Sequence, residues 1–261
     1  MHRLAVAIAA LGLLIPSASL SAADRLEWEV VARRPHDSAA FTQGLVLDGE
    51  QLYESTGLRG RSSLREVDPR SGRVLRIEAL PDRLFGEGLA LVGDELVQLT
   101  WQAGLARRYD VETFELLGTH AYEGEGWGLC YDGERLVMSD GSDRLSFRDP
   151  HDLRLQGTVA VTLDGSPLDQ LNELECVDGE VWANVWFSDS IVRIDPDDGR
   201  VSAVVDLAGL IEPHPSEASA GAVLNGIAYD AVSDTFLVTG KRWPELIEIR
   251  LLEPDAAARW G

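Results

Sequence analysis

One short pattern recurs five times along the chain, and this repeat constrains the fold more than any other feature. Its central residues are separated by 44, 40, 45 and 53 residues. A period of this length indicates one supersecondary unit per repeat. The five segments are Phe-Thr-Gln43-Gly-Leu, Phe-Gly-Glu87-Gly-Leu, Glu-Gly-Trp127-Gly-Leu, Gln-Leu-Asn172-Glu-Leu and Val-Leu-Asn225-Gly-Ile.

Each repeat continues with short apolar stretches that are separated by turns containing Asp or Gly, such as Asp48-Gly49 and Asp178-Gly179. Asp and Gly tolerate the positive φ that tight hairpins require. Short strands in groups of four are typical of β-propeller blades. We therefore predict an all-β, five-bladed β-propeller. A five-repeat solenoid is an alternative, but solenoids usually carry atypical capping repeats at both ends.

The two ends of the repeat region complement one another. The fifth repeat stops after a third strand at residues 246–252, and residues 26–32 alternate like a strand ahead of the first repeat. We predict that this N-terminal strand closes the last blade. Such pairing would hide a strand edge that otherwise invites aggregation.

Equivalent residues of successive blades should surround the channel of a propeller. The first ring would hold Gln43, Glu87, Trp127, Asn172 and Asn225. A second ring lies 14 residues further on, or 16 in the fifth repeat, and reads Gly57, Trp101, Gly141, Trp186 and Lys241. Together the rings predict an aromatic-walled pocket with one carboxylate, one ammonium and several amides, in which the two glycines leave space.

Each of these residues also has a purely structural interpretation. The three ring tryptophans could pack between blades, Glu87 could belong to a turn, and Lys241 could be a solvated neighbour of Arg242. Trp182 and Trp243 fall outside the register of both rings, so we interpret them as packing residues.

The N-terminus has the features of an export signal. A basic start is followed by an apolar run over residues 4–15, which is too short to span a bilayer comfortably. Small residues suited to cleavage follow at 21–23. We predict a signal peptide over residues 1–23 and one propeller domain over 24–261, in the periplasm or secreted, with no membrane attachment after cleavage.

Charge and cysteine content narrow the function further. A net charge of −21 repels phosphates, so a nucleic-acid partner is not expected. Five histidines without ligand spacing disfavour a catalytic zinc. Cys130 and Cys176 are the only cysteines. An oxidising compartment would permit a disulfide between them, but the spacing alone leaves the pairing open.

Eleven motifs, in order, resemble the plant and bacterial glutamine cyclotransferase family, a metal-independent type of glutaminyl-peptide cyclotransferase. They cover nearly all of the chain after the signal. The motifs lie at residues 41–45, 57–65, 85–89, 99–101, 124–129, 138–142, 171–175, 182–186, 195–196, 224–229 and 239–244.

The resemblance implies a five-bladed propeller with an active site at one mouth of the channel. Its expected activity converts the N-terminal glutamine of peptides or proteins to pyroglutamate and releases ammonia, with no cofactor required. Some family members hold calcium in the channel, for which Asn225 is a plausible ligand. We expect a monomer. The implied site residues are Phe41, Gln43, Glu87, Trp101, Trp127, Asn172, Trp186 and Lys241.

Glu87 is our candidate for a general base that later acts as the acid. Aromatic walls would raise its pKa by desolvation. Lys241 would either hold Glu87 ionised or stabilise the oxyanion. Gln43 and Asn172 would hydrogen-bond the substrate amides.

Two other functions fit a propeller of this kind. A calcium-dependent lactonase or esterase would need several acidic ligands, whereas the first ring offers Glu87 with Glu173 beside Asn172. A non-catalytic periplasmic binding protein is the second alternative.

Overall fold

The structure is a computed structural model that describes residues 22–212 and 221–252. Within these ranges the chain forms strands, turns and loops but no helix, which confirms the predicted all-β class. No segment of the described chain is therefore a helix able to cross a membrane. Most of the predicted signal peptide, residues 1–21, lies outside the described residues.

Three sheets each contain four strands that are consecutive in the chain and antiparallel to their neighbours. The first sheet comprises β2 (Thr42–Asp48), β3 (Gln51–Thr56), β4 (Ser63–Val67) and β5 (Val74–Ala79). The second comprises β6 (Gly86–Val92), β7 (Glu95–Thr100), β8 (Leu105–Asp110) and β9 (Leu116–Ala121). The third comprises β10 (Leu129–Tyr131), β11 (Leu136–Ser139), β12 (Arg144–Arg148) and β13 (Leu155–Ala160).

The remaining strands form an eight-stranded sheet and a two-stranded ribbon. The first half of the large sheet is β16 (Leu171–Val177), β17 (Glu180–Val185), β18 (Ser190–Ile194) and β19 (Val201–Asp206). The second half is β1 (Asp24–Pro35), β22 (Glu245–Leu252), β21 (Thr235–Gly240) and β20 (Leu224–Asp230). The ribbon is β14 (Thr162–Leu163) with β15 (Ser166–Pro167).

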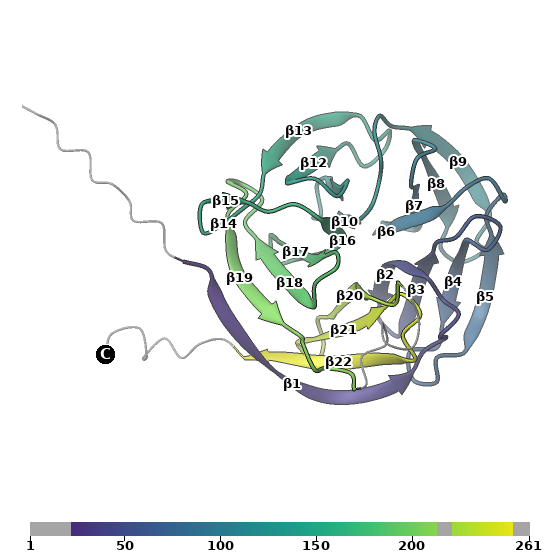
Figure 1. The fold of residues 1–261 in the computed structure, drawn as a ribbon. Coiled ribbons are helices and arrows are strands. Elements are labelled where there is room, and N and C mark those ends of the chain that lie inside the picture. The colour runs from purple at the N-terminus through teal and green to yellow at the C-terminus, as the bar shows by residue number, and fades with distance from the viewer. Residues whose placement is uncertain (1–21, 213–220, 253–261) are drawn as a thin grey trace, which may run out of the picture.

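The N-terminal strand joins the last strand of the chain, as the sequence predicts. β1 runs antiparallel to β22 from Glu27 opposite Leu252 to Pro35 opposite Glu245. Its first residues, Asp24 to Leu26, also pair in parallel with β19, and this short pairing links the two halves of the eight-stranded sheet. Figure 1 shows β1 in purple alongside the yellow β22.

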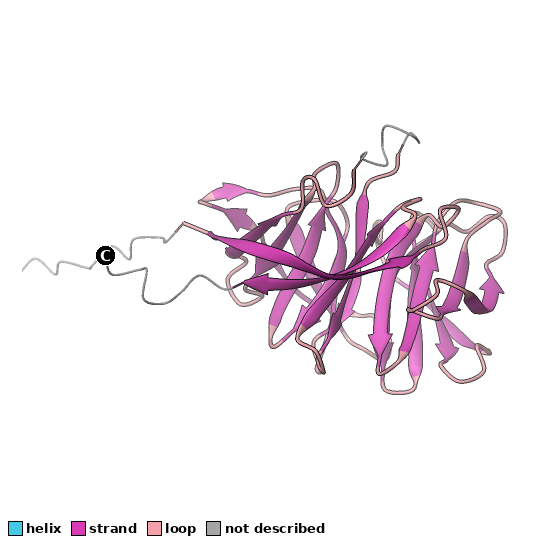
Figure 2. Ribbon diagram, turned by 90° about the horizontal axis from the view of Figure 1, so that it is seen from below, coloured by secondary structure: helices cyan, strands magenta, loops and turns pink. Residues whose placement is uncertain are grey.

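The sheets are arranged as a ring about a central axis (Figures 1 and 2). Each innermost strand contacts the next one around the ring: β2 contacts β6, β6 contacts β10, β10 contacts β16, β16 contacts β20, and β20 contacts β2. The architecture is therefore β-propeller-like, with the first strand of each sequence repeat at the centre.

The buried carboxylate of Glu173 links three of these innermost strands through hydrogen bonds. Glu173 of β16 accepts hydrogen bonds from the backbone N–H of Leu45 in β2 (3.1 Å) and of Ile227 in β20 (2.8 Å). Burial, followed by the charge of Glu175, raises the pKa of the Glu173 carboxyl well above its ordinary value. Glu173 is thus a structural crosslink within the channel.

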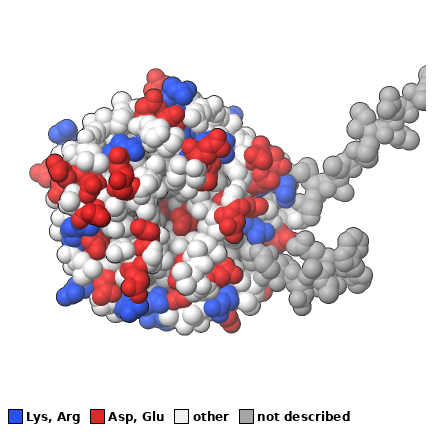
Figure 3. All heavy atoms as spheres, turned by 180° about the vertical axis from the view of Figure 1, so that it is seen from behind, with Lys and Arg blue, Asp and Glu red and all other residues white. Residues whose placement is uncertain are grey.

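The surface of the molecule is strongly acidic. The chain has 44 Asp and Glu residues against 23 Lys and Arg residues. Acidic side chains are spread widely over the face shown in Figure 3.

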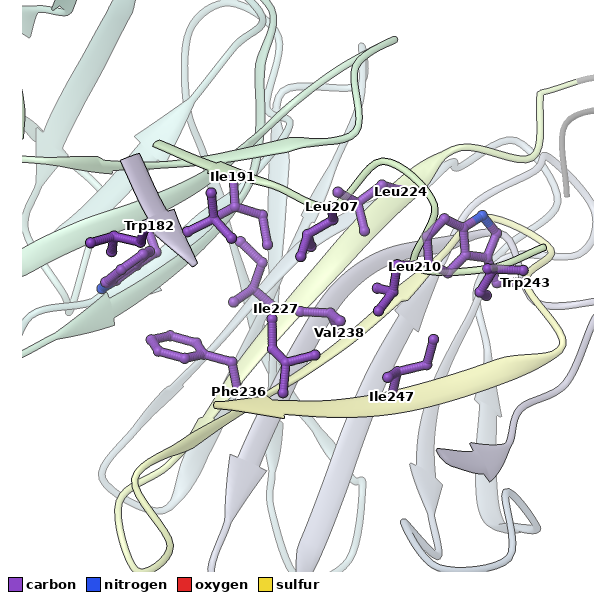
Figure 4. Packing of buried hydrophobic residues seen from close by; sticks show 14 of the residues in the cluster. Trp182, Ile191, Leu207, Leu210, Leu224, Ile227, Phe236, Val238, Trp243 and Ile247 are labelled. Atoms are coloured by element: carbon purple, nitrogen blue, oxygen red, sulfur yellow. The ribbon is translucent and has the colours of Figure 1, made fainter. Parts of the chain in front are cut away.

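Apolar side chains between the two halves of the eight-stranded sheet form one cluster of the core (Figure 4). Trp182 of β17 packs against Phe236 of β21, with ring centroids 4.9 Å apart. Trp243, only 2% exposed, lies in the same cluster. Both tryptophans are therefore packing residues, as their place outside the ring register predicts.

Candidate active site

Four of the five first-ring residues occupy the same structural position, the second residue of an innermost strand. These are Gln43 in β2, Glu87 in β6, Asn172 in β16 and Asn225 in β20, and all four are buried. Each lies where the register of its strand pair shifts. Such a bulge takes a residue out of the ladder and redirects its side chain.

The second-ring residues lie immediately after the second strands, at the same end of the ring because the strand pairs are antiparallel. Trp101 follows β7, Trp186 follows β17 and Lys241 follows β21. In four repeats the second-ring N–H donates to the carbonyl two residues before the first-ring position. These bonds are Gly57 to Phe41 (2.8 Å), Trp101 to Phe85 (3.0 Å), Trp186 to Gln170 (2.8 Å) and Lys241 to Val223 (2.8 Å).

The third repeat departs from this pattern. Trp127 precedes β10 instead of lying within it, and its N–H donates to the carbonyl of Ser139 (3.0 Å). Gly126, just before it, donates its N–H to the carbonyl of Trp101 (3.1 Å). The segment before Trp127 is therefore joined to the neighbouring repeat.

Glu87 lies at the centre of the site. Its side chain accepts a hydrogen bond from Gln43 Nε2 at 2.9 Å, and the residue is 4% exposed. Burial raises the pKa of the Glu87 carboxyl well above its ordinary value. The ammonium of Lys241 opposes this increase, and the carboxylate of Glu125 adds to it.

Lys241 is buried against two aromatic faces. Its Nζ lies 5.3 Å from the ring centroid of Phe41 and 5.5 Å from that of Trp186. At these distances the rings attract the cation. Burial lowers the pKa of Lys241 to about 8, although the charge of Glu87 acts in the opposite direction.

Aromatic rings form the walls around these charges. Phe41 meets Phe85 edge-on at 6.1 Å, and Phe85 meets Trp101 at 5.6 Å. Trp127 and Trp186 make a perpendicular pair at 5.2 Å. The structure thus brings Phe41, Trp127 and Trp186 close to one another through Lys241 and the ring contacts.

The two second-ring glycines leave no open space, contrary to our expectation. A Cβ at Gly57 would lie 2.3 Å from the ring of Phe85, and one at Gly141 would lie 2.6 Å from the ring of Trp127. The space that each glycine provides is filled by an aromatic side chain. The glycines therefore allow the rings of the wall to approach the backbone.

Three residues of the site were missed by sequence reasoning: Phe85, Glu125 and Phe187. Phe85 and Glu125 both lie two residues before a first-ring position, as Phe41 does, so the repeat could have identified them. Phe187 is 71% exposed and stacks on Trp186 at 4.0 Å. No feature of the repeat distinguishes it.

The amide side chains of the first ring differ in their hydrogen bonds to the site. Asn225 Nδ2 donates to Gln43 Oε1 at 3.2 Å, which extends the hydrogen-bonded chain from Glu87 through Gln43. The buried Oδ1 atoms of Asn172 and Asn225 have no hydrogen-bond partner in the described chain. Polar atoms of this kind are available to a ligand.

The described part of the chain contains a disulfide but no cluster of His, Cys, Asp or Glu side chains that suits a metal ion. Cys130 of β10 and Cys176 of β16 form a disulfide with a Cα–Cα distance of 5.5 Å. In residues 22–212 and 221–252, no three His, Cys, Asp or Glu side chains are grouped so that they could hold a metal ion.

Comparison with known proteins places the chain in a family. Residues 4–251 match the family model of glutamine cyclotransferase. A glutaminyl-peptide cyclotransferase of Arabidopsis thaliana is 42% identical over 233 residues, which is 88% of this chain and 73% of that protein. The crystal structure of Myxococcus xanthus glutaminyl cyclase superposes with a TM-score of 0.84 at 40% identity, over 89% of this chain and 100% of that one. The chain therefore belongs to the glutamine cyclotransferase family.

Proposed function

We propose that this protein is a glutaminyl-peptide cyclotransferase that converts the N-terminal glutamine of peptides to pyroglutamate and releases ammonia. The family membership and the names of its two relatives support this activity. The observation that carries it is the buried Glu87, hydrogen-bonded to Gln43 and electrostatically coupled to Lys241.

The reaction is an intramolecular aminolysis. The substrate α-nitrogen forms a bond to its own side-chain amide carbon, and the bond from that carbon to the amide nitrogen breaks. The attacking nitrogen loses a proton and the leaving nitrogen gains one, so ammonia departs without any further reactant. A free α-amine has a pKa of about 7.7 to 8.0, so deprotonating it requires only a modest base.

Glu87 would carry out this proton transfer. Because burial raises its pKa, the carboxylate is a better base than an exposed glutamate and can return the proton to the leaving group. Lys241 would stabilise the negative charge that develops on the amide oxygen. Its attraction to Glu87 also keeps part of the carboxyl population ionised before the substrate binds.

The neighbouring groups would orient the substrate. Phe41, Trp101, Trp127 and Trp186 would hold the glutamine side chain folded back towards its own amine, which accelerates ring closure by proximity. Gln43 and Asn172 would hydrogen-bond the substrate amides, and the unpartnered Oδ1 of Asn172 supports this assignment.

Replacing Glu87 with glutamine tests the assignment directly. We expect ammonia release from a glutamine-initiated dipeptide to fall at least about a hundredfold, because the general acid–base is lost. Glu50→Gln, a charge removal at an exposed residue, should leave turnover unchanged. Near-wild-type turnover by Glu87→Gln would refute the role of this carboxylate.

We also propose that the ring is a five-bladed propeller. The cycle of five innermost strands supports this count, and so does the division of the eight-stranded sheet into two groups of four. The last blade would then consist of β20, β21, β22 and the N-terminal strand β1.

A structural calcium ion is a further proposal for the channel. The unpartnered Oδ1 of Asn225 is an oxygen ligand of the type that calcium prefers. A chelator should then lower the melting temperature and leave ammonia release intact. Chelator-sensitive hydrolysis of a lactone or ester, restored only by added calcium, would instead favour the lactonase or esterase alternative.

Export and a monomeric state are proposed as well. The disulfide fits an oxidising compartment such as the periplasm or the extracellular medium. N-terminal sequencing of the exported protein should begin at Asp24, and light scattering should give the mass of one chain. Intact residues 1–23 on the exported protein would contradict the predicted cleavage.

A binding protein without catalysis remains the third function to test. Incubation with a glutamine-initiated peptide, followed by mass spectrometry, separates the possibilities. A cyclase removes the mass of one ammonia from the peptide, whereas a binding protein leaves the mass unchanged.

A further inference from the structure

Glu125 makes three side-chain hydrogen bonds at the wall of the pocket. Its Oε2 accepts one from Trp101 Nε1 at 2.6 Å and one from Trp127 Nε1 at 3.1 Å. Its Oε1 accepts a third from Gln102 Nε2 at 3.1 Å. One carboxylate oxygen therefore joins two indole rings that come from different sequence repeats.

The irregular backbone of the third repeat places Glu125 there. In the other repeats, the residue two before the first-ring position holds the second-ring residue through its carbonyl. The third repeat is bonded differently, because its first-ring residue Trp127 donates its own N–H to the carbonyl of Ser139. The bond from Gly126 to Trp101 then brings Glu125 next to the neighbouring repeat.

Glu125 remains charged in this position. Partial burial acts to raise the pKa of its carboxyl, but the hydrogen bonds from Gln102, Trp127 and Trp101 outweigh this effect and lower the pKa below its ordinary value. Hydrogen bonds to an ionised acceptor are stronger than those between neutral groups. The carboxylate thus holds both indoles more firmly than a neutral acceptor would.

We propose that Glu125 is a positioning residue of the cyclisation site: its hydrogen bonds fix the rings of Trp101 and Trp127 in one orientation, and its negative charge acts on Glu87 across the pocket. The inference rests on the proposed function, since it assigns Glu125 a part in that reaction. We assign the proton transfer to Glu87 and not to Glu125, because the lowered pKa of the Glu125 carboxyl makes it the weaker base.

Two charges of opposite sign act on Glu87 across the site. Lys241, after β21, favours the ionised carboxylate, and Glu125, before β10, disfavours it. Gln43 is a neutral hydrogen-bond partner. Tyr122 is also coupled to Glu87, but burial raises the pKa of its hydroxyl so far that it stays uncharged. Removing the charge of Glu125 should therefore ease ionisation of Glu87.

Two substitutions separate the roles of charge and hydrogen bonding. Glu125→Gln keeps an acceptor oxygen for the indoles but removes the charge. We expect the acidic midpoint of the kcat/KM profile to move to lower pH, with KM changed less than about threefold. Glu125→Ala also leaves two indole donors without an acceptor, so KM should rise about tenfold and the near-ultraviolet circular dichroism of tryptophan should weaken.

Glu123→Gln is the matched control. It removes a carboxylate from an exposed residue of the same segment but leaves both indole bonds and the charge of Glu125, so KM and the pH midpoint should stay at wild-type values. Melting temperatures of all variants would show whether a change in kinetics comes from unfolding.

The inference is overturned if Glu125→Gln keeps the wild-type pH midpoint and Glu125→Ala keeps the wild-type KM and circular dichroism. Failure of the proposed function has a different signature. In that case the wild-type protein releases no ammonia from any glutamine-initiated peptide, while the tryptophan signal still reports whether Glu125 holds the indoles.

Discussion

Glu87 and Lys241 each change the pKa of the other, and burial shifts the pKa of both groups as well. Burial moves the two pKa values towards each other, upwards for the acid and downwards to about 8 for the amine, and mutual attraction resists both changes. Glu87 therefore titrates at higher pH, and Lys241 at lower pH, than exposed side chains of the same type.

These shifts predict a bell-shaped dependence of kcat/KM on pH. The carboxylate form of Glu87 and the neutral form of the substrate amine are both lost as the pH falls, so the acidic midpoint should lie above the ordinary glutamate value of 4.5. Protonated Lys241 is lost as the pH rises through about 8, so activity should fall there. Deprotonation of the substrate amine cannot cause this alkaline decline, because the neutral amine is the attacking form.

Lys241→Arg provides the check on the alkaline limb. A guanidinium stays protonated throughout this range, so any activity that the variant retains should no longer decline near pH 8. A decline with an unchanged midpoint would show that another group is responsible.

At the scale of strands, the sequence predicted most of the framework of the site. The five repeats set which residues begin the innermost strands. The spacing of 14 residues, or 16 in the fifth repeat, identified Trp101, Trp186 and Lys241 at the same end of the ring. The third repeat departs from this pattern, because the N–H of Trp127 bonds to Ser139 and Trp127 lies outside β10. The bonds of Gly126 and Glu125 with Trp101 connect two repeats, and spacing along the chain does not encode such bonds, so the role of Glu125 was missed.

The disulfide also depends on spatial proximity. Cys130 and Cys176 lie on the neighbouring innermost strands β10 and β16, and the sequence alone left their pairing open.

Removing this crosslink should destabilise the folded protein. We expect the double variant Cys130→Ala with Cys176→Ala to lose about 2–4 kcal/mol of unfolding free energy, since the unfolded chain gains conformational freedom. Urea unfolding of the variant and the oxidised wild type would measure the loss. Equal midpoints would contradict a stabilising role. Reduced wild-type protein lacks the crosslink but keeps both cysteine side chains, so it is the control for packing that the alanine substitutions remove.

At the scale of the whole molecule, the excess of acidic residues creates a negative field that reaches beyond the site. Acidic groups cover the surface widely (Figure 3), and the net charge is −21. A field of this sign attracts cationic ligands and repels anionic ones before contact.

The field predicts a salt-dependent preference among substrates. Raising the ionic strength from 0.01 M to 1 M shortens the screening length from about 30 Å to about 3 Å. The KM of a glutamine-initiated peptide with two lysines should then rise several-fold, and that of its glutamate counterpart should fall. A neutral peptide of equal length is the control, and parallel changes in all three would exclude steering by charge.

The pairing of β1 with β22 has a consequence for how the molecule is made. Glu27 lies opposite Leu252, so the two paired segments are separated by nearly the whole of the described chain. Joining such distant segments requires closing a very long loop, which slows folding. The ring consequently stays open between β1 and β22 until both segments are available, and the acid, the amine and the indoles reach their final geometry only after it closes.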